Sequence, residues 1–255
     1  MDAFDRAREC LSEEGFLWIS HRKMLSAYRG CAVCDWAESG DGWSMALRIP
    51  VSASPFDQSA YPGARWVVYL ASSPNGGIAD AIERLPREPS VFKLVSEEQE
   101  QAVRRRFALR RTRAYLSYTC SDFHEEDDAR VIRSDVFSVE GMPLWGQNGY
   151  TETGVRGFFE QGARSTVLRE EGLPVAACLS FPNDGEIWEI GALYTVPEYR
   201  NRGFARIVAR AAASDLLRKG KMPRYQVVES NVASVSLVES MGWRRVLTLT
   251  HFLSE

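Results

Sequence analysis

The sequence predicts an α/β fold in which helices cover both faces of a β-sheet. Three observations indicate this. In the second half of the chain, apolar β-prone runs alternate with segments whose apolar residues recur at helical spacing. The first half follows the same order of helices and strands. Turns that contain Gly or Pro, such as 39–42 and 172–174, separate the segments.

The first half opens with two amphipathic stretches and then becomes β-prone. A hairpin is expected early, because two β-prone runs flank the turn Ser39-Gly40-Asp41-Gly42. Further runs alternate between helical and extended patterns up to about residue 120. We predict helices at 2–13, 21–29, 78–85 and 97–107, and strands at 31–38, 43–49, 66–71, 91–95 and 112–119.

The second half has the clearest patterns. The run EIWEIGALYTV at 186–196 is apolar and β-prone, with Gly185 before it and Pro197 after it. Apolar residues then recur at i+4 from Phe204 to Leu216, and Gly220 is a natural helix stop. We predict helices at 125–138, 151–161, 203–219 and 231–241, and strands at 165–169, 173–181, 186–196, 224–229 and 243–252.

Composition describes an ordinary globular chain. The 255 residues are 45% hydrophobic and 25% charged, which fits one or two domains. A net charge of −3 argues against nucleic acid as the partner. No apolar run is long enough for a membrane span, and the charged N-terminus does not resemble a signal peptide. We therefore expect a cytoplasmic protein with reduced cysteines and no membrane partner.

Cysteines and histidines give no strong chemical signal. Cys31 and Cys34 form a C-x-x-C pair that could bind a metal or act in redox chemistry, but a strand would point them to opposite faces. Packing is the preferred interpretation, so no metal is expected. None of the three histidines, His21, His124 and His251, has a convincing nucleophile nearby in sequence.

The most informative segment is YRNRGFA at 199–205. It lies between the β-prone run 186–196 and the helix 203–219. An Arg-x-x-Gly-x-Ala turn at such a junction directs several backbone N–H groups to one place, and the helix N-terminus adds about half a positive charge. This arrangement suits the binding of a pyrophosphate.

A second motif follows in the expected order. After the strand at 224–229, the residues at 231–243 read N-x-A-S-x-x-L-x-x-x-x-G-W. Together the two segments resemble the signature segments of the GNAT superfamily of acyl-CoA N-acyltransferases. The resemblance covers roughly residues 121–255 and is closest to the branch of glycine N-acyltransferases and zwittermicin-resistance-type acetyltransferases. It implies the GNAT fold, with a mixed and splayed central sheet.

The repeated order of elements suggests that the chain contains this fold twice. Residues 74–79 follow the strand 66–71 and have the spacing of the phosphate loop, with Pro74 where Arg200 stands. We interpret residues 1–120 as a degenerate GNAT-like lobe and residues 121–255 as the competent acetyltransferase domain. The alternative is that residues 1–120 are a family-specific α/β extension.

The resemblance also implies a cofactor site for acetyl-CoA as acyl donor. Backbone amides at a bulge in the strand before the loop would bind the acyl carbonyl and pantetheine, and the loop would bind the pyrophosphate. Arg202 and Arg206 are open to a second interpretation, as solvated surface charges. The implied cofactor-binding residues are Leu193, Tyr194, Thr195, Arg200, Asn201, Arg202, Gly203, Phe204, Ala205, Arg206 and Asn231.

Glu189 is the main catalytic candidate, because it occupies the place of the general-base glutamate in the histone-acetylating branch. Strand parity predicts that Glu189, Gly191, Leu193 and Thr195 share one face. A partly desolvated carboxylate there could deprotonate an ammonium group. The alternative is an ordinary solvent-facing residue, and Glu186, on the opposite face, is the weaker candidate.

The chain departs from the superfamily pattern at Val238, where many relatives carry a tyrosine that protonates the departing thiolate. Either another group supplies this proton or the thiolate leaves unassisted. Ser234 is a candidate donor, although its hydroxyl could instead cap the helix. Asn231 is expected to cap the same helix and, by resemblance, to contact pantetheine.

These features predict an N-acetyltransferase that moves a small acyl group from CoA to a primary amine by direct transfer in a ternary complex. The expected acceptor is a small molecule, and the protein is expected to be a monomer or a homodimer. Two alternatives remain: acetylation of a protein lysine or N-terminus, and a non-catalytic module that senses acyl-CoA. Glu189→Gln, if it lost turnover but kept binding, would favour catalysis over sensing.

Overall fold

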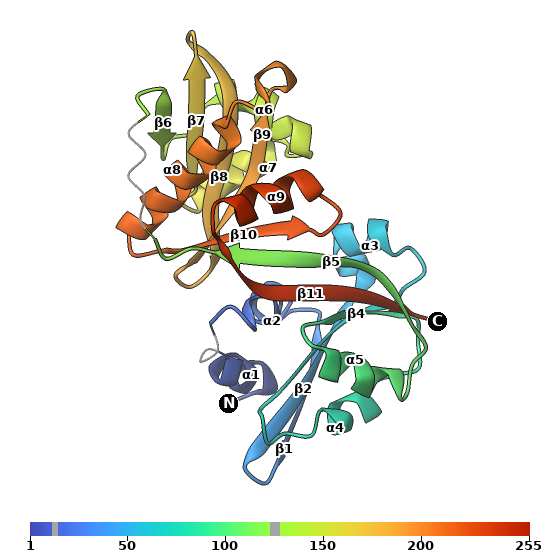
Figure 1. Cartoon of the computed structure of the whole chain (residues 1–255). Helices are drawn as coiled ribbons and strands as arrows, with labels where there is room; N and C mark the ends of the chain where they lie inside the picture. Colours follow the sequence, from blue (N-terminus) through green and yellow to red (C-terminus); the bar gives the residue numbers. More distant parts are fainter. Residues whose placement is uncertain (12–14, 123–127) are drawn as a thin grey trace. The chain divides into compact units, whose positions relative to one another are not determined.

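The computed structural model describes residues 1–11, 15–122 and 128–255, and the chain forms two compact units (Figure 1). The first unit comprises Met1–Leu116, Val228–Ser230 and Val246–Glu255. The second comprises Ser117–Val227 and Asn231–Arg245. The first passage between units thus lies close to the predicted division at 120 and 121, whereas the end of the chain belongs to the first unit.

The first unit is built on a sheet whose strands follow the order β1-β2-β3-β4-β11. Strands β1, β2 and β3 form an antiparallel meander, β4 is parallel to β3, and β11 is antiparallel to β4. Its elements are α1 (Ala3–Leu11), α2 (Ile19–Ala27), β1 (Val33–Ser39), β2 (Gly42–Pro50), α3 (Pro55–Ala60), β3 (Trp66–Ser72), α4 (Ile78–Glu83), β4 (Ser90–Leu94), α5 (Glu97–Arg104), the start of β5 (Leu109–Thr119) and most of β11 (Arg244–Ser254).

Alternation along these strands builds a core on each face of the sheet. Leu47 and Tyr69 pack with Leu11 and Leu25 of α1 and α2, whereas their strand neighbours pack with α4 and α5. Successive side chains of a strand point to opposite faces, so the two helix pairs cover the two sides. The second core contains Ala46, Val68, Leu70, Ala81, Ile82, Phe92, Val103 and Phe252.

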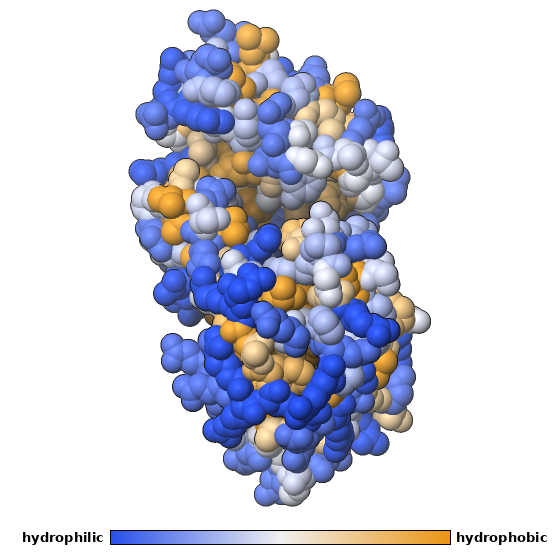
Figure 2. Space-filling view, turned by 90° about the vertical axis from the view of Figure 1, so that its right-hand side faces the viewer, coloured by the Kyte–Doolittle hydropathy of each residue, from blue (hydrophilic) through white to orange (hydrophobic). Residues whose placement is uncertain are grey.

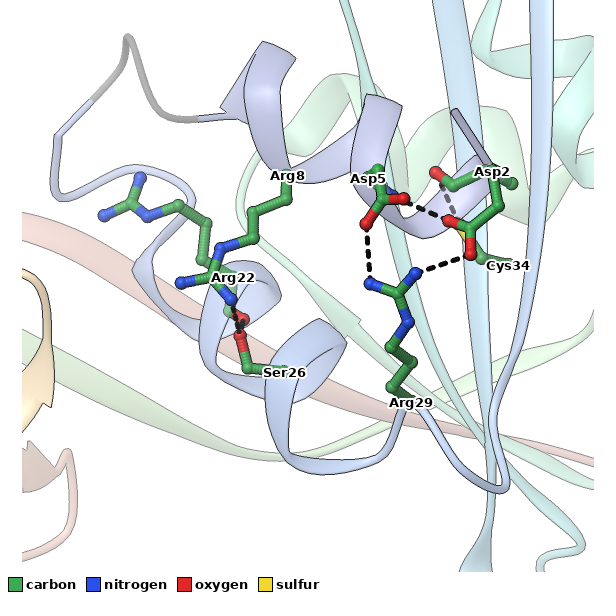
Figure 3. Close-up of polar contacts among 8 residues, drawn as sticks. Asp2, Asp5, Arg8, Arg22, Ser26, Arg29 and Cys34 are labelled. Carbon is green, nitrogen blue, oxygen red and sulfur yellow. Dashed lines mark hydrogen bonds and ion pairs between the residues drawn. The ribbon is translucent and has the colours of Figure 1, made fainter.

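Polar contacts fasten the two N-terminal helices to each other (Figure 3). Arg29, just beyond α2, donates hydrogen bonds to Asp2 and Asp5 at 2.5 and 2.6 Å, and Arg8 donates to Ser26 at 2.7 Å. The Arg29 guanidinium lowers the pKa of the Asp5 carboxyl. These pairs are exposed, so they orient the helices more than they stabilise them.

The two cysteines of the C-x-x-C pair lie next to these two helices. Cys34 lies on β1, and its thiol is 3.8 Å from the carbonyl oxygen of Ala3, while the Cys31 thiol is 3.7 Å from that of Tyr28. Burial, with Asp35 nearby, raises the pKa of the Cys34 thiol to about 12. The packing interpretation therefore fits Cys34, which is partly buried, whereas Cys31 is exposed and precedes the strand.

The second unit repeats the same topology. Strands β7, β8 and β9 form an antiparallel meander and β10 is parallel to β9, as β4 is to β3. A helix links each parallel pair, α8 in this unit and α4 in the first. The elements are β6 (Val131–Ser134), α6 (Met142–Trp145), α7 (Glu152–Glu160), β7 (Arg164–Glu170), β8 (Leu173–Asp184), β9 (Ile187–Thr195), α8 (Phe204–Arg218), β10 (Met222–Val228) and α9 (Val232–Ser240).

Opposite faces of the second sheet carry α8 and the α6–α7 pair. Ala177 and Leu179 of β8 pack in a cluster with Trp145 and Val155, whereas Cys178 between them faces the Val208 carbonyl of α8. The predicted α/β class, with a mixed sheet and the same strand order in both units, is confirmed. The matching strand order in both units is the feature that the duplication hypothesis required.

Three sequence expectations differ from the structure. The helix predicted at 125–138 is wrong over its described part, 128–138, which contains strand β6 instead; 125–127 lie outside the described residues, as do 12–13 of the first predicted helix and His124. The terminal strand pairs with β4 and therefore completes the first sheet. The short helices α3 and α6 were not predicted.

Among the described residues, no helix is both long and apolar enough to cross a membrane. Figure 2 shows a face in which hydrophilic side chains predominate and hydrophobic ones gather in separate patches.

Candidate functional site

Strand β9 carries a bulge in the second unit. Ala177 of β8 lies opposite Tyr194 and Leu179 lies opposite Gly191, so that two residues of β9 face one of β8. Ala192, one of the two, has φ 53°, in the left-handed region that a side chain disfavours. The bulge redirects the backbone N–H groups that follow Gly191.

Because of the bulge, the side chains of β9 do not alternate between the two faces of the sheet as predicted. Residues directly opposite each other on antiparallel strands share a face, so Glu189 lies with Phe181, Gly191 with Leu179, and Tyr194 with Ala177. The extra residue shifts the alternation. Leu193 and Thr195 therefore do not continue the face of Glu189 and Gly191, as strict alternation predicted.

Strands β9 and β10 separate next to the bulge. Their parallel pairing runs from Ile187 and Met222 to Glu189 and Arg224. Beyond it β9 continues to Thr195 and β10 to Val228. A sheet that opens in this way presents backbone donors and acceptors on both inner edges, to which an extended amide-containing ligand can bind as an additional strand.

The loop after β9 is shaped for an anion. Asn201 and Gly203 have φ of 61° and 80°, and Gly203 directly precedes α8. No described atom lies within 4 Å of a Cβ built on Gly203, so the approach to this backbone is open. Free N–H groups and the helix dipole converge here, as a pyrophosphate requires.

A cleft of about 600 Å³ connects the loop, the end of β9 and α9, all within the second unit. It brings together most of the predicted cofactor residues and adds Tyr199, Ala233, Ser236, Leu237 and Ser240, which sequence reasoning missed because helix α9 faces the cleft along its length. The predicted residues in its lining are Leu193, Tyr194, Thr195, Arg200, Asn201, Gly203, Phe204, Ala205, Arg206 and Ser234.

The three loop arginines have different surroundings. Arg200 donates from Nε to the Thr195 carbonyl at 3.1 Å and lies over the Tyr194 ring. Arg206 lines the cleft. Arg202 lies outside the lining, with its guanidinium 5.1 Å from the Tyr199 ring centroid. Arg200 and Arg206 are therefore placed for a phosphate, whereas Arg202 is placed as a surface charge.

Helix α9 begins with the predicted cap. Asn231 Oδ1 accepts the backbone N–H of Ser234 at 3.2 Å, and Asn231 itself does not line the cleft. Ser234 itself lines the cleft, and burial raises the pKa of the nearby Tyr225 hydroxyl on β10. Val238 is fully buried and has no hydroxyl, whereas Ser234, the predicted donor, lines the cleft.

Glu189 is buried, with 8% of its surface exposed, and the protein's own donors engage both of its carboxylate oxygens. Oε2 accepts hydrogen bonds from Arg224 at 2.8 Å and Asn183 at 2.9 Å, and Oε1 accepts the Gln226 N–H at 3.0 Å. The alternative of a solvent-facing residue is thereby excluded. General-base catalysis by Glu189 remains a prediction. Glu186, in contrast, is exposed and pairs with Lys221.

Aromatic side chains gather on the Glu189 face of β9. Phe158 stacks on Phe181 with ring centroids 4.5 Å apart, and Tyr150 contacts Phe158 edge to face. The Tyr150 hydroxyl lies 3.5 Å from a Cβ built on Gly191, next to the bulge. These side chains, with the buried Trp145, belong to the core on this face.

The equivalent region of the first unit is more closed. The loop at 73–77 is shorter than that at 196–203, and Gly77 before α4 has an ordinary φ of −78°. A Cβ on Gly76 would overlap the Trp43 carbonyl, which shows how tightly this loop packs. The adjoining cavity, of about 350 Å³, is lined by Ser73, Pro74 and Gln99 among others, and contains no arginine.

Comparison with known proteins agrees with this geometry. Residues 169–252 match the model of the FR47-like protein family, and no curated protein sequence is similar to the chain. A GCN5-related N-acetyltransferase from Kribbella flavida is 14% identical over 94% of this chain and 96% of its own, with a TM-score of 0.59.

Two further solved structures have the same fold. An acetyltransferase of the GNAT family from Colwellia psychrerythraea is 11% identical over 94% of this chain and 96% of its own, with a TM-score of 0.57. A tandem GNAT protein from the clavulanic acid biosynthesis pathway is 12% identical over 91% and 86%, with a TM-score of 0.52. At such identities the likeness concerns the fold.

Proposed function

We propose that the protein is an N-acetyltransferase that transfers an acetyl group from acetyl-CoA to a primary amine of a small molecule, by direct transfer in a ternary complex. The observation that carries the proposal is the cleft of the second unit, in which a bulged, splayed strand leads to an anion-binding loop at a helix N-terminus. Each part fits a different portion of acetyl-CoA.

The loop would bind the pyrophosphate. The N–H groups around Gly203 and the N-terminus of α8 supply donors, and Arg200 and Arg206 supply charge. The open edge of β9 at 193–195 would pair with the amides of the pantetheine arm, and the redirected N–H groups at the bulge would stabilise charge that develops on the thioester oxygen.

Direct transfer agrees with the side chains near the cleft. Cys178, the cysteine closest to it in sequence, is fully buried on β8, and burial raises the pKa of its thiol to about 12. Such a thiol does not serve as an acyl-accepting nucleophile. The acceptor amine would then attack the thioester itself, and the proton for the departing sulfur would come from the Ser234 hydroxyl, which lines the cleft.

The sequence likeness of 231–243 to the glycine N-acyltransferase and zwittermicin-resistance branch supports an amino-acid-like or antibiotic-like amine as acceptor. Acyl-CoA sensing without transfer is a second candidate, favoured by one observation: the superfamily's tyrosine position is occupied by the buried Val238. An acetyltransferase and a sensor would both bind acyl-CoA, but only the acetyltransferase would transfer its acyl group.

The test has two stages. Isothermal titration calorimetry with acetyl-CoA should give binding with a Kd of about 1 µM, about −8 kcal/mol. Release of the CoA thiol, followed with a thiol reagent, is then measured against a panel of amino acids, polyamines and aminoglycosides, with a lysine peptide as the protein-type acceptor. Binding without turnover for every acceptor would favour sensing, and absence of binding would refute both.

A further inference from the structure

We propose that Glu189 is a positioning residue that keeps β9 and β10 apart, so that the cofactor cleft stays open, and that it does this through the backbone N–H of Gln226. The proposal rests on the proposed function, because it concerns the same cleft. It assigns Glu189 to the binding of CoA instead of to proton abstraction from the amine.

The hydrogen-bond pattern of the parallel strands identifies the position. The Met222 N–H donates to the Glu186 carbonyl at 2.8 Å. Donors toward one neighbour recur at every second residue, so those of Arg224 and Gln226 also face β9. The regular acceptor for Gln226 would be the carbonyl of Ile190, but the paired register ends at Arg224 and Glu189. Glu189 Oε1 accepts this N–H instead, at 3.0 Å.

The carboxylate is held rigidly for this task. Its other oxygen accepts from Arg224 at 2.8 Å and from Asn183 at 2.9 Å. Arg224 is 3% exposed and is itself fixed by two hydrogen bonds to Ser117 Oγ, at 3.0 and 3.2 Å. A buried, charge-assisted network of this kind fixes side-chain positions well.

In the first unit, a different residue accepts the hydrogen bond of the first N–H beyond the end of the parallel pairing. Its paired register ends at Tyr69 and Lys93, and the N–H two residues further, of Val95, donates to Gln99 Oε1 at 2.9 Å. The Gln99 Nε2 group donates to the Leu70 carbonyl at 2.9 Å. The side-chain amide of Gln99 therefore replaces the missing backbone hydrogen bond between β3 and β4, because it binds the donor on β4 and the acceptor on β3. In both units, a polar side chain satisfies the first donor beyond the end of the pairing.

The chemical reason is the cost of an unpaired donor. A buried N–H without an acceptor is unfavourable, so a gap between strands closes or fills with water unless another group satisfies it. In the second unit, Glu189 lies on β9 itself and accepts the Gln226 N–H of β10. The rest of the gap between the two strands is therefore left for a ligand. Loss of the carboxylate should allow β10 to close on β9 and should weaken CoA binding.

The experiment compares Glu189→Ala, the double variant Glu189→Gln with Arg224→Met, and Glu186→Gln. Glutamine keeps an oxygen for the Gln226 N–H, and methionine removes the guanidinium that would otherwise be left unpaired. Glu186→Gln changes an exposed carboxylate on the same edge of the unit and is the matched control. Acetyl-CoA affinity is measured by calorimetry, folding by thermal denaturation, and kcat and KM over a range of pH.

We expect Glu189→Ala to raise the Kd for acetyl-CoA by at least about tenfold, because the Gln226 N–H and the buried Arg224 both lose the carboxylate that they bind. The double variant and Glu186→Gln should stay within about threefold of wild type in Kd. The double variant should also retain the acidic limb of its pH profile.

Native affinity in a folded Glu189→Ala protein would overturn the proposal, as would a double variant that binds acetyl-CoA but loses kcat and the acidic limb of its pH profile. The latter result would establish Glu189 as the base. If neither wild type nor Glu186→Gln binds acetyl-CoA, the proposed function itself fails.

Discussion

Arg206, in the first turn of α8, donates a hydrogen bond from Nη2 to the Oγ of Ser240, the last residue of α9, at 3.0 Å. Both residues line the cleft of the second unit. This contact places a guanidinium beside the N-terminus of α8, where the backbone donors and the helix dipole already favour an anion. Arg202, close by in sequence, does not line the cleft and lies over the Tyr199 ring.

Arg206→Ala should therefore raise the Kd for acetyl-CoA by about three- to tenfold, because one exposed charge-assisted contact to phosphate is lost. Arg202→Ala is the matched control and should change it less than about twofold. Calorimetry at low and high salt checks both, since the difference should shrink as salt screens the charge. Equal effects of the two variants would contradict the assignment.

Gly203→Trp should abolish acetyl-CoA binding while the protein still unfolds cooperatively. The indole would fill the open approach to the loop, and φ of 80° adds strain of about 1–2 kcal/mol for any residue with a Cβ. Gly203→Ala carries the same strain with little bulk and should retain measurable binding. Thermal denaturation and calorimetry separate the two effects, and native affinity in the tryptophan variant would refute the loop assignment.

Acetyl-CoA should bind with a stoichiometry of one per chain. In the first unit the side chain of Gln99 occupies the broken ladder between Leu70 and Val95, and the short loop at 73–77 has no arginine. Calorimetry of the wild-type protein measures this directly. A second site that survives Gly203→Trp would show that the first unit also binds CoA.

The first unit should lose stability in mild acid because of His21. Burial lowers the pKa of this fully buried imidazole from 6.5 to about 4. The unfolded chain then binds the proton more readily, so the free energy of unfolding is complete above about pH 6.5 and falls by up to about 3 kcal/mol as pH drops toward 4.

Urea denaturation at pH 7 and pH 5 tests this. His21→Gln keeps a donor for the Leu70 carbonyl, with which His21 Nε2 hydrogen-bonds at 2.9 Å, and should lose less stability between the two pH values than wild type. His251, whose pKa burial lowers to about 2, titrates in both proteins and so cancels. An unchanged pH dependence in the variant would contradict this role of His21.

Ser234→Ala should lower kcat more than it changes the Kd for acetyl-CoA, if the hydroxyl delivers a proton to the departing sulfur. The loss in kcat should be about tenfold or more for Ser234→Ala, and Tyr225→Phe, which removes a buried hydroxyl outside the cleft lining, is the comparison. Steady-state kinetics with the best amine acceptor, as a function of pH, measures it. Unchanged kcat in both variants would mean that the thiolate leaves unassisted.

Local sequence signals were sufficient for the repeated order of strands and helices and for the position of the loop between β9 and α8. The turn Gly40-Asp41, the run 186–196 and the loop 200–205 each carry their information in neighbouring residues. The helix predicted at 125–138 was wrong where it can be compared, because residues 131–134 form the short edge strand β6, which includes the charged Arg133. Edge strands tolerate such charges, and β6 pairs only with β7 among the described strands.

The bulge and the register between strands could not be predicted from such local patterns. At Ala192, which has a left-handed backbone conformation, the alternation of side chains between the two faces of β9 is inverted. The neighbouring residues in the sequence give no sign of this bulge. The partners of Glu189 depend on the register between β9 and β10, which joins residues far apart in sequence. For the same reason, the terminal strand was recognised as a strand but assigned to the wrong sheet.

The position of β11 has a consequence for how the protein is made. The N-terminal sheet receives its strand next to β4, with the core residue Phe252, from the end of the chain. While the ribosome is still translating the second half, β4 exposes an unpaired edge and an incomplete core. Folding of the first unit therefore waits for a strand that is translated after the second unit, and a premature stop shortly before β11 would damage the first unit while leaving the cleft of the second unit encoded.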